Sequence, residues 1–252
     1  MVRQHVVHRL PQPGAMSQLA AGLLEIISRS RHILLDFDGP VCAIYAGTPA
    51  PIIAARLRHA LGQTGIKLPP QAEGMGDPLE VFRVVADMGD DFAELAQREL
   101  TSLETKAVTT ATPTPGAAEM ISAARQSGRT VSIVSNNSGR AVSAYLARQR
   151  TTTDIKLVIG RNDSDPALMK PSPYMVRAAV GILDADNCEC VFVGDSATDV
   201  LAGLLAGVPV IGYANSPAKV EALTQAQAAA VTTDLAEITT ALRQTRSPAL
   251  PN

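Results

Sequence analysis

The residues with the clearest capacity for chemistry lie in four short stretches that are far apart in the chain. In three of them, polar side chains directly follow a run of apolar, β-prone residues, and the remaining stretch offers a lysine in a loop. These candidates are Asp36 and Asp38, Ser135 and Asn136, Lys170, and Asp195 and Asp199. Taken singly, each stretch has a plain structural explanation, because such residues are common in turns, at helix N-caps and on solvated surfaces.

The four aspartates are informative as a set. Carboxylates delivered to one edge of a sheet repel one another, and two such charges about 4 Å apart cost about 4 kcal/mol at an effective dielectric constant of 20. A bound cation would remove this repulsion. Oxygen ligands suit Mg²⁺, which binds one or two carboxylates together with water and a substrate phosphate. Neither histidine nor cysteine is part of these motifs, which argues against zinc.

A doubly wound α/β fold would position these side chains. The apolar stretch at 32–36 predicts a buried parallel strand that delivers Asp36 and Asp38 to its carboxyl end. Further strands are predicted at 130–134, 157–159, 190–193 and 208–211, with helices between and after them at 116–127, 138–150, 173–182, 198–206, 216–226 and 234–243. This alternation is typical of a parallel sheet with helices on both faces. Such Rossmann-like sheets bind ligands at the carboxyl ends of their strands.

A second pattern follows the first strand. Helices are predicted near 50–62, 77–89 and 90–107, and Asp77 followed by Pro78 is a strong helix start. The repeated Thr-Pro pairs at 112–115 favour a stiff linker back to the sheet. We therefore predict a core domain of residues 17–40 and 113–245, a helical cap domain of residues 41–112, and tails at 1–16 and 246–252.

Composition excludes several classes of protein. The net charge is -2 and aromatic residues make up 3% of the chain, so neither nucleic acid nor an anionic membrane is an expected partner. No apolar run is long enough to span a bilayer, and the N-terminal residues lack the apolar core of a signal peptide. The 3 cysteines do not suggest a disulfide scaffold, so we expect a reducing compartment, the cytoplasm.

The order of the motifs is more specific than any one of them. Asp-x-Asp-Gly, then Ser after a second strand, then Lys, then Gly-Asp-Ser-x-x-x-Asp resembles the haloacid dehalogenase-like superfamily of phosphohydrolases, over about residues 30–215. The resemblance implies a phosphatase in which Asp36 is the nucleophile that forms an aspartyl-phosphate. It implies that Asp38 is the general acid and base. It also implies that Ser135 and Lys170 bind the phosphate, and we add the amide of Asn136 to that site.

The same resemblance implies a Mg²⁺ site made by Asp36, Asp38, Asp195 and Asp199, with Asp38 contributing its backbone carbonyl and Asp199 a supporting ligand. The chemistry of the residue types agrees with these roles. A carboxylate with a pKa near 4 is ionised at neutral pH, so it needs no base to act as a nucleophile. Its attack on an anionic phosphate requires nearby cations, which Mg²⁺ and Lys170 would supply. Ser135 precedes a predicted helix, and a helix N-terminus attracts anions.

Spacing places the helical insertion. Ser135 lies 99 positions after Asp36, which is far more than one crossover helix needs, whereas Lys170 lies only 35 positions after Ser135. An insertion directly after the nucleophile is similar to the helical caps of the phosphoglycolate-phosphatase and β-phosphoglucomutase type, which would close over the site and select the leaving group. Pro40 departs from the family, which often has threonine or an aliphatic residue there, and would stiffen the turn that lets the cap move.

Several activities are compatible with these residues. Our preferred hypothesis is hydrolysis of a small phosphorylated metabolite. A phosphomutase would use the same residues and differ in the lifetime of the phospho-aspartate. Dehalogenation of a 2-haloacid needs no metal and leaves Asp38, Asp195 and Asp199 without a role. A phosphonatase would need a Schiff-base lysine in the cap, and neither Lys67 nor Lys106 has an apolar setting. A phosphate-binding protein without catalysis is the alternative from another class. The pattern selects neither the substrate nor an oligomeric state.

Overall fold

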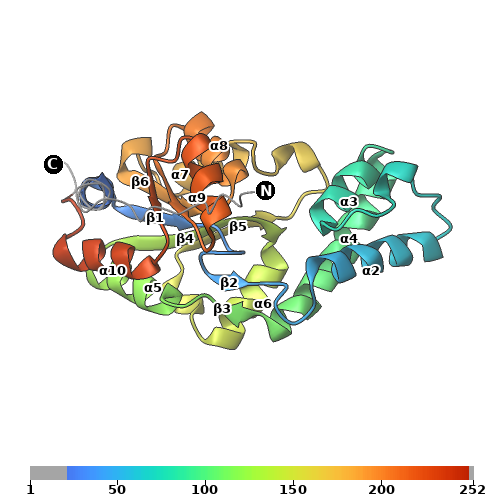
Figure 1. The fold of residues 1–252 in the computed structure, drawn as a ribbon, viewed down its shortest axis with the longest axis horizontal. Coiled ribbons are helices and arrows are strands. Elements are labelled where there is room, and N and C mark those ends of the chain that lie inside the picture. The colour runs from blue at the N-terminus through green and yellow to red at the C-terminus, as the bar shows by residue number, and fades with distance from the viewer. Residues whose placement is uncertain (1–21, 250–252) are drawn as a thin grey trace, which may run out of the picture.

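The computed structural model describes residues 22–249. A six-stranded sheet lies at its centre, with the strand order β5-β4-β1-β6-β7-β8 and every neighbouring pair parallel (Figure 1). The strands are β1 (His32–Leu35), β4 (Thr130–Ser138), β5 (Leu157–Arg161), β6 (Cys190–Gly194), β7 (Val210–Tyr213) and β8 (Ala230–Thr232). The predicted doubly wound α/β class is therefore confirmed.

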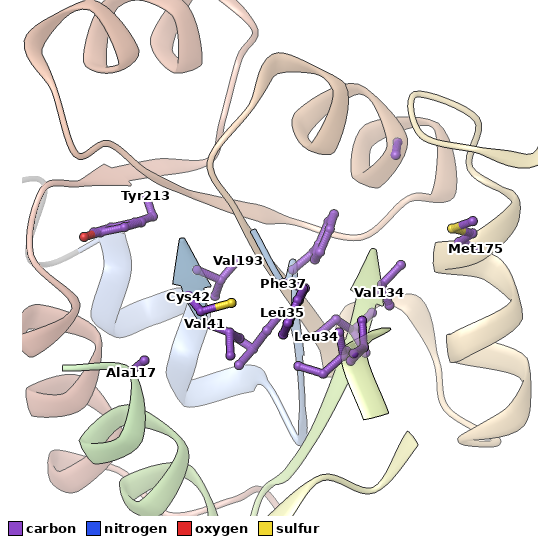
Figure 2. Close-up of a cluster of buried hydrophobic side chains, with 14 of the residues drawn as sticks. Leu34, Leu35, Phe37, Val41, Cys42, Ala117, Val134, Met175, Val193 and Tyr213 are labelled. Carbon is purple, nitrogen blue, oxygen red and sulfur yellow. The ribbon is translucent and has the colours of Figure 1, made fainter. Parts of the chain in front are cut away.

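Strand β1 lies inside the sheet because its residues are apolar on both faces. Leu35 faces Ile133 of β4 on one side and Val193 of β6 on the other, so the three strands reach the same level of the sheet. Figure 2 shows Leu34, Leu35, Val193 and neighbouring apolar side chains gathered around this strand. Leu34 and Leu35 are 0% exposed, and burying such a side chain contributes about 1.5–3 kcal/mol.

Helices cover both faces of the sheet, as its parallel strands require. Figure 1 shows α7, α8 and α9 on one side and α5, α6 and α10 on the other. Their bounds are α5 (Ala117–Gln126), α6 (Gly139–Gln149), α7 (Tyr174–Ile182), α8 (Ala197–Ala206), α9 (Pro217–Gln225) and α10 (Leu235–Gln244). The predicted helix before β1 is helical at residues 22–29, while Ser17, its predicted cap, and the predicted tail 1–16 lie outside the described residues.

The helical insertion lies at one end of the molecule (Figure 1). It contains α2 (Ala50–Gln63), α3 (Pro78–Ala86) and α4 (Asp90–Ala107), which pack against one another. We call these three helices and their connections the helical unit. Two short antiparallel strands, β2 (Cys42–Ala43) and β3 (Thr112–Pro113), lie side by side where the chain enters and leaves it. The predicted start of α3 is observed, since the Asp77 side chain accepts a hydrogen bond from the Leu79 N–H and Pro78 is the first helical residue.

Several features of the sheet differ from the sequence-based prediction. Strand β5 continues to Arg161, beyond its predicted end at residue 159. Strand β4 continues to Ser138, beyond the predicted end at residue 134, with a register shift between Val134 and Ser138 against β5. Strand β7 begins at Val210 instead of residue 208. The edge strand β8 was not predicted, because three residues, Ala-Val-Thr, are too short for a periodic signal. Among residues 22–249, no helix combines the length and the apolarity needed to cross a membrane.

Candidate active site

Three of the predicted carboxylates meet at the carboxyl ends of β1 and β6, which are neighbours in the sheet. Asp36, Asp195 and Asp199 each contribute one oxygen, and these oxygens lie within 4.8 Å of one another. The N–H of Asp36 donates to the carbonyl of Val193 at 2.8 Å, which ties the residue to β6. Within residues 22–249 this is the one cluster of three or more side chains able to hold a metal ion. Its all-oxygen donor set suits a hard divalent cation.

The electrostatics of this cluster also favour a bound cation. Asp36 is 7% exposed, and burial raises the pKa of its carboxyl to about 8 even though Lys170 acts in the opposite direction. Burial likewise raises the pKa of Asp195, with Lys219 opposing the shift. When all three carboxylates are ionised, they also outnumber the two lysines that pair with them, Lys170 and Lys219. A divalent cation among the three carboxylates would lower both pKa values and complete the site.

Lys170 lies at the centre of the cluster and is only 2% exposed. Its ammonium donates to the carboxylates of Asp36 at 2.8 Å and Asp199 at 2.5 Å, and to the carbonyl of Val134 at 3.2 Å. Burial alone would lower the pKa of Lys170, but the two carboxylates outweigh it and raise the pKa above its usual range. The lysine is thus a permanent buried cation next to Asp36, and not the solvated residue that its isolated position in the sequence would suggest.

Asp199 is held more firmly than the other carboxylates. Its Oδ2 accepts hydrogen bonds from the N–H groups of Asp195 at 3.1 Å and Ser196 at 3.0 Å, and from the Ser196 hydroxyl at 2.6 Å. The same Ser196 hydroxyl accepts from the Asp199 N–H, so the pair forms the capping box that starts α8. Because Lys170 occupies Oδ1, both oxygens of Asp199 are already bonded. This arrangement is better suited to supporting a metal site than to carrying most of it.

Lys219 is a residue at the site that the sequence did not reveal. It lies on α9 and its ammonium pairs with Oδ2 of Asp195, while its side chain is 36% exposed. A single lysine in a predicted surface helix carries no local signal of this contact. The pair arises because β7 and α9 follow β6 around the sheet and bring α9 beside the end of β6.

The segment Ser135–Ser138 lies at the carboxyl end of β4, and we call it the phosphate segment after the role that the sequence predicted for Ser135 and Asn136. The sequence predicted that Ser135 and Asn136 stand where a helix begins, but both lie in the extended strand, and Ser138 is the N-cap of α6. The Asn136 side chain instead pairs with the backbone of Lys170, accepting from its N–H at 2.8 Å and donating to its carbonyl at 3.0 Å. The Ser135 hydroxyl accepts from the Asn137 N–H at 3.2 Å.

Asp38 lies beside the cluster but outside the three-carboxylate group. Its Oδ1 accepts a hydrogen bond from the Ile44 N–H at 2.9 Å, and burial raises the pKa of its carboxyl to about 6. The next residue must be glycine for two reasons. Gly39 has a φ of 115°, and a Cβ there would lie 2.4 Å from Cγ of Asp195. The turn after β1 therefore passes directly against the end of β6.

All seven predicted site residues line one cavity of about 300 Å³, namely Asp36, Asp38, Ser135, Asn136, Lys170, Asp195 and Asp199. The lining also includes residues of the insertion and of the segment leading into it, namely Tyr45, Ala50, Asp77 and Leu79. The Tyr45 hydroxyl oxygen is buried and has no hydrogen-bond partner among the described residues. Arg83 donates to the Lys170 carbonyl at 3.2 Å but does not line the cavity.

Comparisons with known proteins agree with this geometry. Residues 31–207 match the hydrolase family described as haloacid dehalogenase-like hydrolase. The plasmid phosphoglycolate phosphatase of Cupriavidus necator is 38% identical over 104 residues, which are 40% of this chain and 44% of that protein. The phosphoglycolate phosphatase of Neisseria meningitidis is 25% identical over 207 residues, covering 74% of this chain and 81% of that protein. The chain thus spans less than half of the first relative and most of the second.

Among solved structures, the fold is similar to that of a predicted phosphatase from Clostridium acetobutylicum. The TM-score is 0.64 at 17% sequence identity, and the match covers 85% of this chain and 99% of that one. At this identity the similarity concerns the fold alone.

Proposed function

The chain belongs to the haloacid dehalogenase-like hydrolase family, and from this premise we propose that it is a Mg²⁺-dependent phosphatase of small phosphomonoesters. One observation carries the proposal. A buried lysine bridges two carboxylates, Asp36 and Asp199, in a cluster that is completed by Asp195 and opens on a cavity. A structural ion pair would need one carboxylate for one lysine, whereas this cluster has a surplus of negative charge that a divalent cation and an incoming phosphate would use together.

In the proposed reaction, Asp36 attacks phosphorus and forms an aspartyl-phosphate. Lys170, 2.8 Å from Asp36, holds positive charge at the point where the nucleophile meets an anionic phosphate. Asp36, Asp195 and the backbone carbonyl of Asp38, with Asp199 in support, would hold Mg²⁺, which would supply further positive charge at the phosphate oxygens. The Ser135 hydroxyl and the backbone N–H of Asn136 bind the phosphate from the β4 side.

Asp38 is the proposed general acid and base. Its raised pKa of about 6 leaves part of the carboxyl protonated near neutral pH, so it can protonate the leaving oxygen. In the second step the same carboxylate removes a proton from the water that hydrolyses the aspartyl-phosphate. The hydrogen bond from the Ile44 N–H fixes its orientation between these steps.

The helical unit is proposed to act as a cap with β2 and β3 as its hinge. It contributes Ala50, Asp77 and Leu79 to the wall of the cavity that the carboxylates also line, and Tyr45 precedes it. These residues would contact the leaving group and exclude bulk water while the aspartyl-phosphate exists.

The three cysteines, Cys42, Cys188 and Cys190, are all free thiols, which supports a reducing compartment, and we propose the cytoplasm.

A phosphate-release screen tests this function. The panel should include phosphoglycolate, because relatives carry that name, together with sugar phosphates and p-nitrophenyl phosphate, each with and without Mg²⁺. We expect release that depends on Mg²⁺ and is lost in Asp36→Asn, a variant that keeps the shape of the side chain but removes the nucleophile. Undiminished release by Asp36→Asn would remove Asp36 from the mechanism. Interconversion of sugar phosphates without release would indicate a phosphomutase instead.

A further inference from the structure

Glu104, near the end of α4, is a buried carboxylate that the proposed reaction does not use. Its side chain is 0% exposed, and all of its hydrogen-bond donors come from the sheet side of the molecule. Oε1 accepts from the side-chain amide of Asn137 at 3.1 Å, and Oε2 accepts from the Ser138 N–H at 2.9 Å and from the Arg161 guanidinium at 2.7 Å. A buried charge with this many partners is costly to separate from any of them.

Arg161, at the end of β5, is the second half of this contact and is 1% exposed. Its Nε donates to the carbonyl of Asn136 at 3.0 Å. The rest of the guanidinium faces the helical unit, where it donates to the side chain of Gln97 and lies 5.0 Å from the centre of the Phe82 ring. A single side chain therefore contacts the phosphate segment and two helices of the helical unit.

The phosphate segment is consequently held by the helical unit as well as by the neighbouring strand. Asn137 and Ser138 are bonded to Glu104 of α4, and Asn136 is bonded to Arg161 of β5, which in turn pairs with Glu104. Lys170 and Ser135 are connected to Glu104 and Arg161 indirectly, through these asparagines. Asn136 pairs with the backbone of Lys170, and the Asn137 N–H donates to the hydroxyl of Ser135. An extended segment with a register shift against its neighbouring strand has few backbone bonds of its own to fix it.

We propose that Glu104 and Arg161 are positioning residues, a buried ion pair through which the helical unit sets the conformation of the phosphate segment. The phosphate site is then complete only when the helical unit is seated against the sheet. By linkage, phosphate bound at Ser135 favours the seated arrangement to the same extent. This inference rests on the proposed function for its ligand, but the contact between Glu104 and the phosphate segment is independent of any reaction.

The test compares Glu104→Gln with a matched control, Arg148→Met. Glu104→Gln keeps the shape of the side chain and removes its charge, so the buried Arg161 guanidinium no longer has a carboxylate as its partner. Arg148 also joins the sheet side to the chain just after α4, by donating to the carbonyls of Thr109 at 2.9 Å and Ala111 at 2.8 Å, but it has no hydrogen bond to the phosphate segment. Glu104→Gln loses an anion and Arg148→Met loses a cation, each from a contact between the sheet side and α4 or the chain just after it. Both variants are therefore expected to lower the melting temperature.

The readouts are the Kd of inorganic phosphate in the presence of Mg²⁺, the kcat and KM for p-nitrophenyl phosphate, and amide hydrogen exchange of residues 135–138. For Glu104→Gln we expect Kd and KM to rise by about tenfold, a typical coupling between sites, together with faster exchange in this segment. Arg148→Met should leave Kd within about twofold and exchange in this segment unchanged. If Glu104→Gln does not fold, Arg161→Lys keeps the charge but loses the bond to Asn136, and should show the same changes at smaller size.

Two results would overturn the inference: unchanged exchange at residues 135–138 in Glu104→Gln, or equal weakening of phosphate binding in Glu104→Gln and Arg148→Met. The failure of the proposed function has a different signature. A wild-type protein that neither binds nor releases phosphate would refute that function, and faster exchange confined to Glu104→Gln would still establish the coupling between α4 and the phosphate segment.

Discussion

Replacing Lys170 by methionine should destabilise the folded protein strongly and in a pH-dependent way. The ammonium lies 2.8 Å from Asp36 and 2.5 Å from Asp199, and at an effective dielectric constant of 20 each attraction is about 6 kcal/mol. Desolvation of the three groups offsets much of this, and removing one partner of a buried pair typically costs about 3–5 kcal/mol. The carboxylates left behind repel one another, since the oxygens of Asp36, Asp195 and Asp199 lie within 4.8 Å of one another. At that distance and the same dielectric constant, two negative charges repel by about 3.5 kcal/mol.

The sign of the pH effect follows from Asp36. Its pKa in the folded protein is already raised to about 8 by burial, and losing Lys170 raises it further above the unfolded value of about 4. The folded variant then binds more protons than the unfolded chain between these values, so its stability falls as pH rises. The folded wild type also keeps this proton up to about pH 8, so the two proteins differ in bound protons only above that pH. The expected loss in the free energy of unfolding is therefore about 3–5 kcal/mol at pH near 9 and smaller at pH near 7.

Urea unfolding of the metal-free protein at both pH values measures this loss. Lys219→Met is the matched control, because Lys219 also pairs with a carboxylate of the cluster but is 36% exposed, so its loss should be about 1 kcal/mol or less. A Lys170→Met protein that unfolds within about 1 kcal/mol of wild type at the higher pH, or that loses the same amount at both, would refute the reasoning.

Three further predictions concern the turn, the acid and the cavity wall. Gly39→Ala should abolish phosphate release and lower the melting temperature, since its φ is 115° and a Cβ would meet Asp195 at 2.4 Å; a fully active variant would contradict this. Asp38→Asn should slow the hydrolysis of alkyl phosphates by about 100-fold or more and that of p-nitrophenyl phosphate much less. The wild-type rate with alkyl phosphates should fall as pH rises through about 6, where the acid loses its proton. Equal losses of rate for the two substrates in Asp38→Asn would exclude this role. Asp77→Asn keeps the N-cap of α3 but removes a negative charge from the cavity wall. The kcat/KM for phosphoglycolate, whose leaving group carries a carboxylate, should therefore rise by about threefold to tenfold, while that for sugar phosphates with neutral leaving groups changes little. The same change for both kinds of substrate would argue against this role.

Much of the site could be predicted because its signals are local. A buried parallel strand requires a continuous apolar run, and the polar residue that ends it is then placed at the carboxyl edge of the sheet, as Asp36 and Asp195 are. The apolar runs and helix patterns of the chain were sufficient for the α/β class. The end of β4 was not predicted, because the polar Ser135–Ser138 has no apolar pattern and continues as a strand through pairing with β5 at Arg161.

Glu104 shows most clearly what the sequence left undecided. The buried residues of α4 are Ala93, Ala96, Leu100, Glu104 and Ala107, so a glutamate occupies a position on the apolar stripe, and this was the one signal that could have identified it. Glu94 and Glu99 on the same helix are not buried. Periodicity shows which face of a helix is covered, whereas the partner of a buried charge is decided by the element that covers it.

The sequence by itself therefore predicted the order of the strands' polar ends, the place of the helical insertion, and the residues from Asp36 to Asp199 that line one cavity. Only the tertiary structure decided that Lys170 lies between two carboxylates, that Lys219 reaches Asp195, and that Glu104 and Arg161 connect the helical unit to the phosphate segment. The physical reason is that turns, caps and apolar runs depend on near neighbours in the chain, while the pairing of buried charges depends on which surfaces meet after the chain has folded.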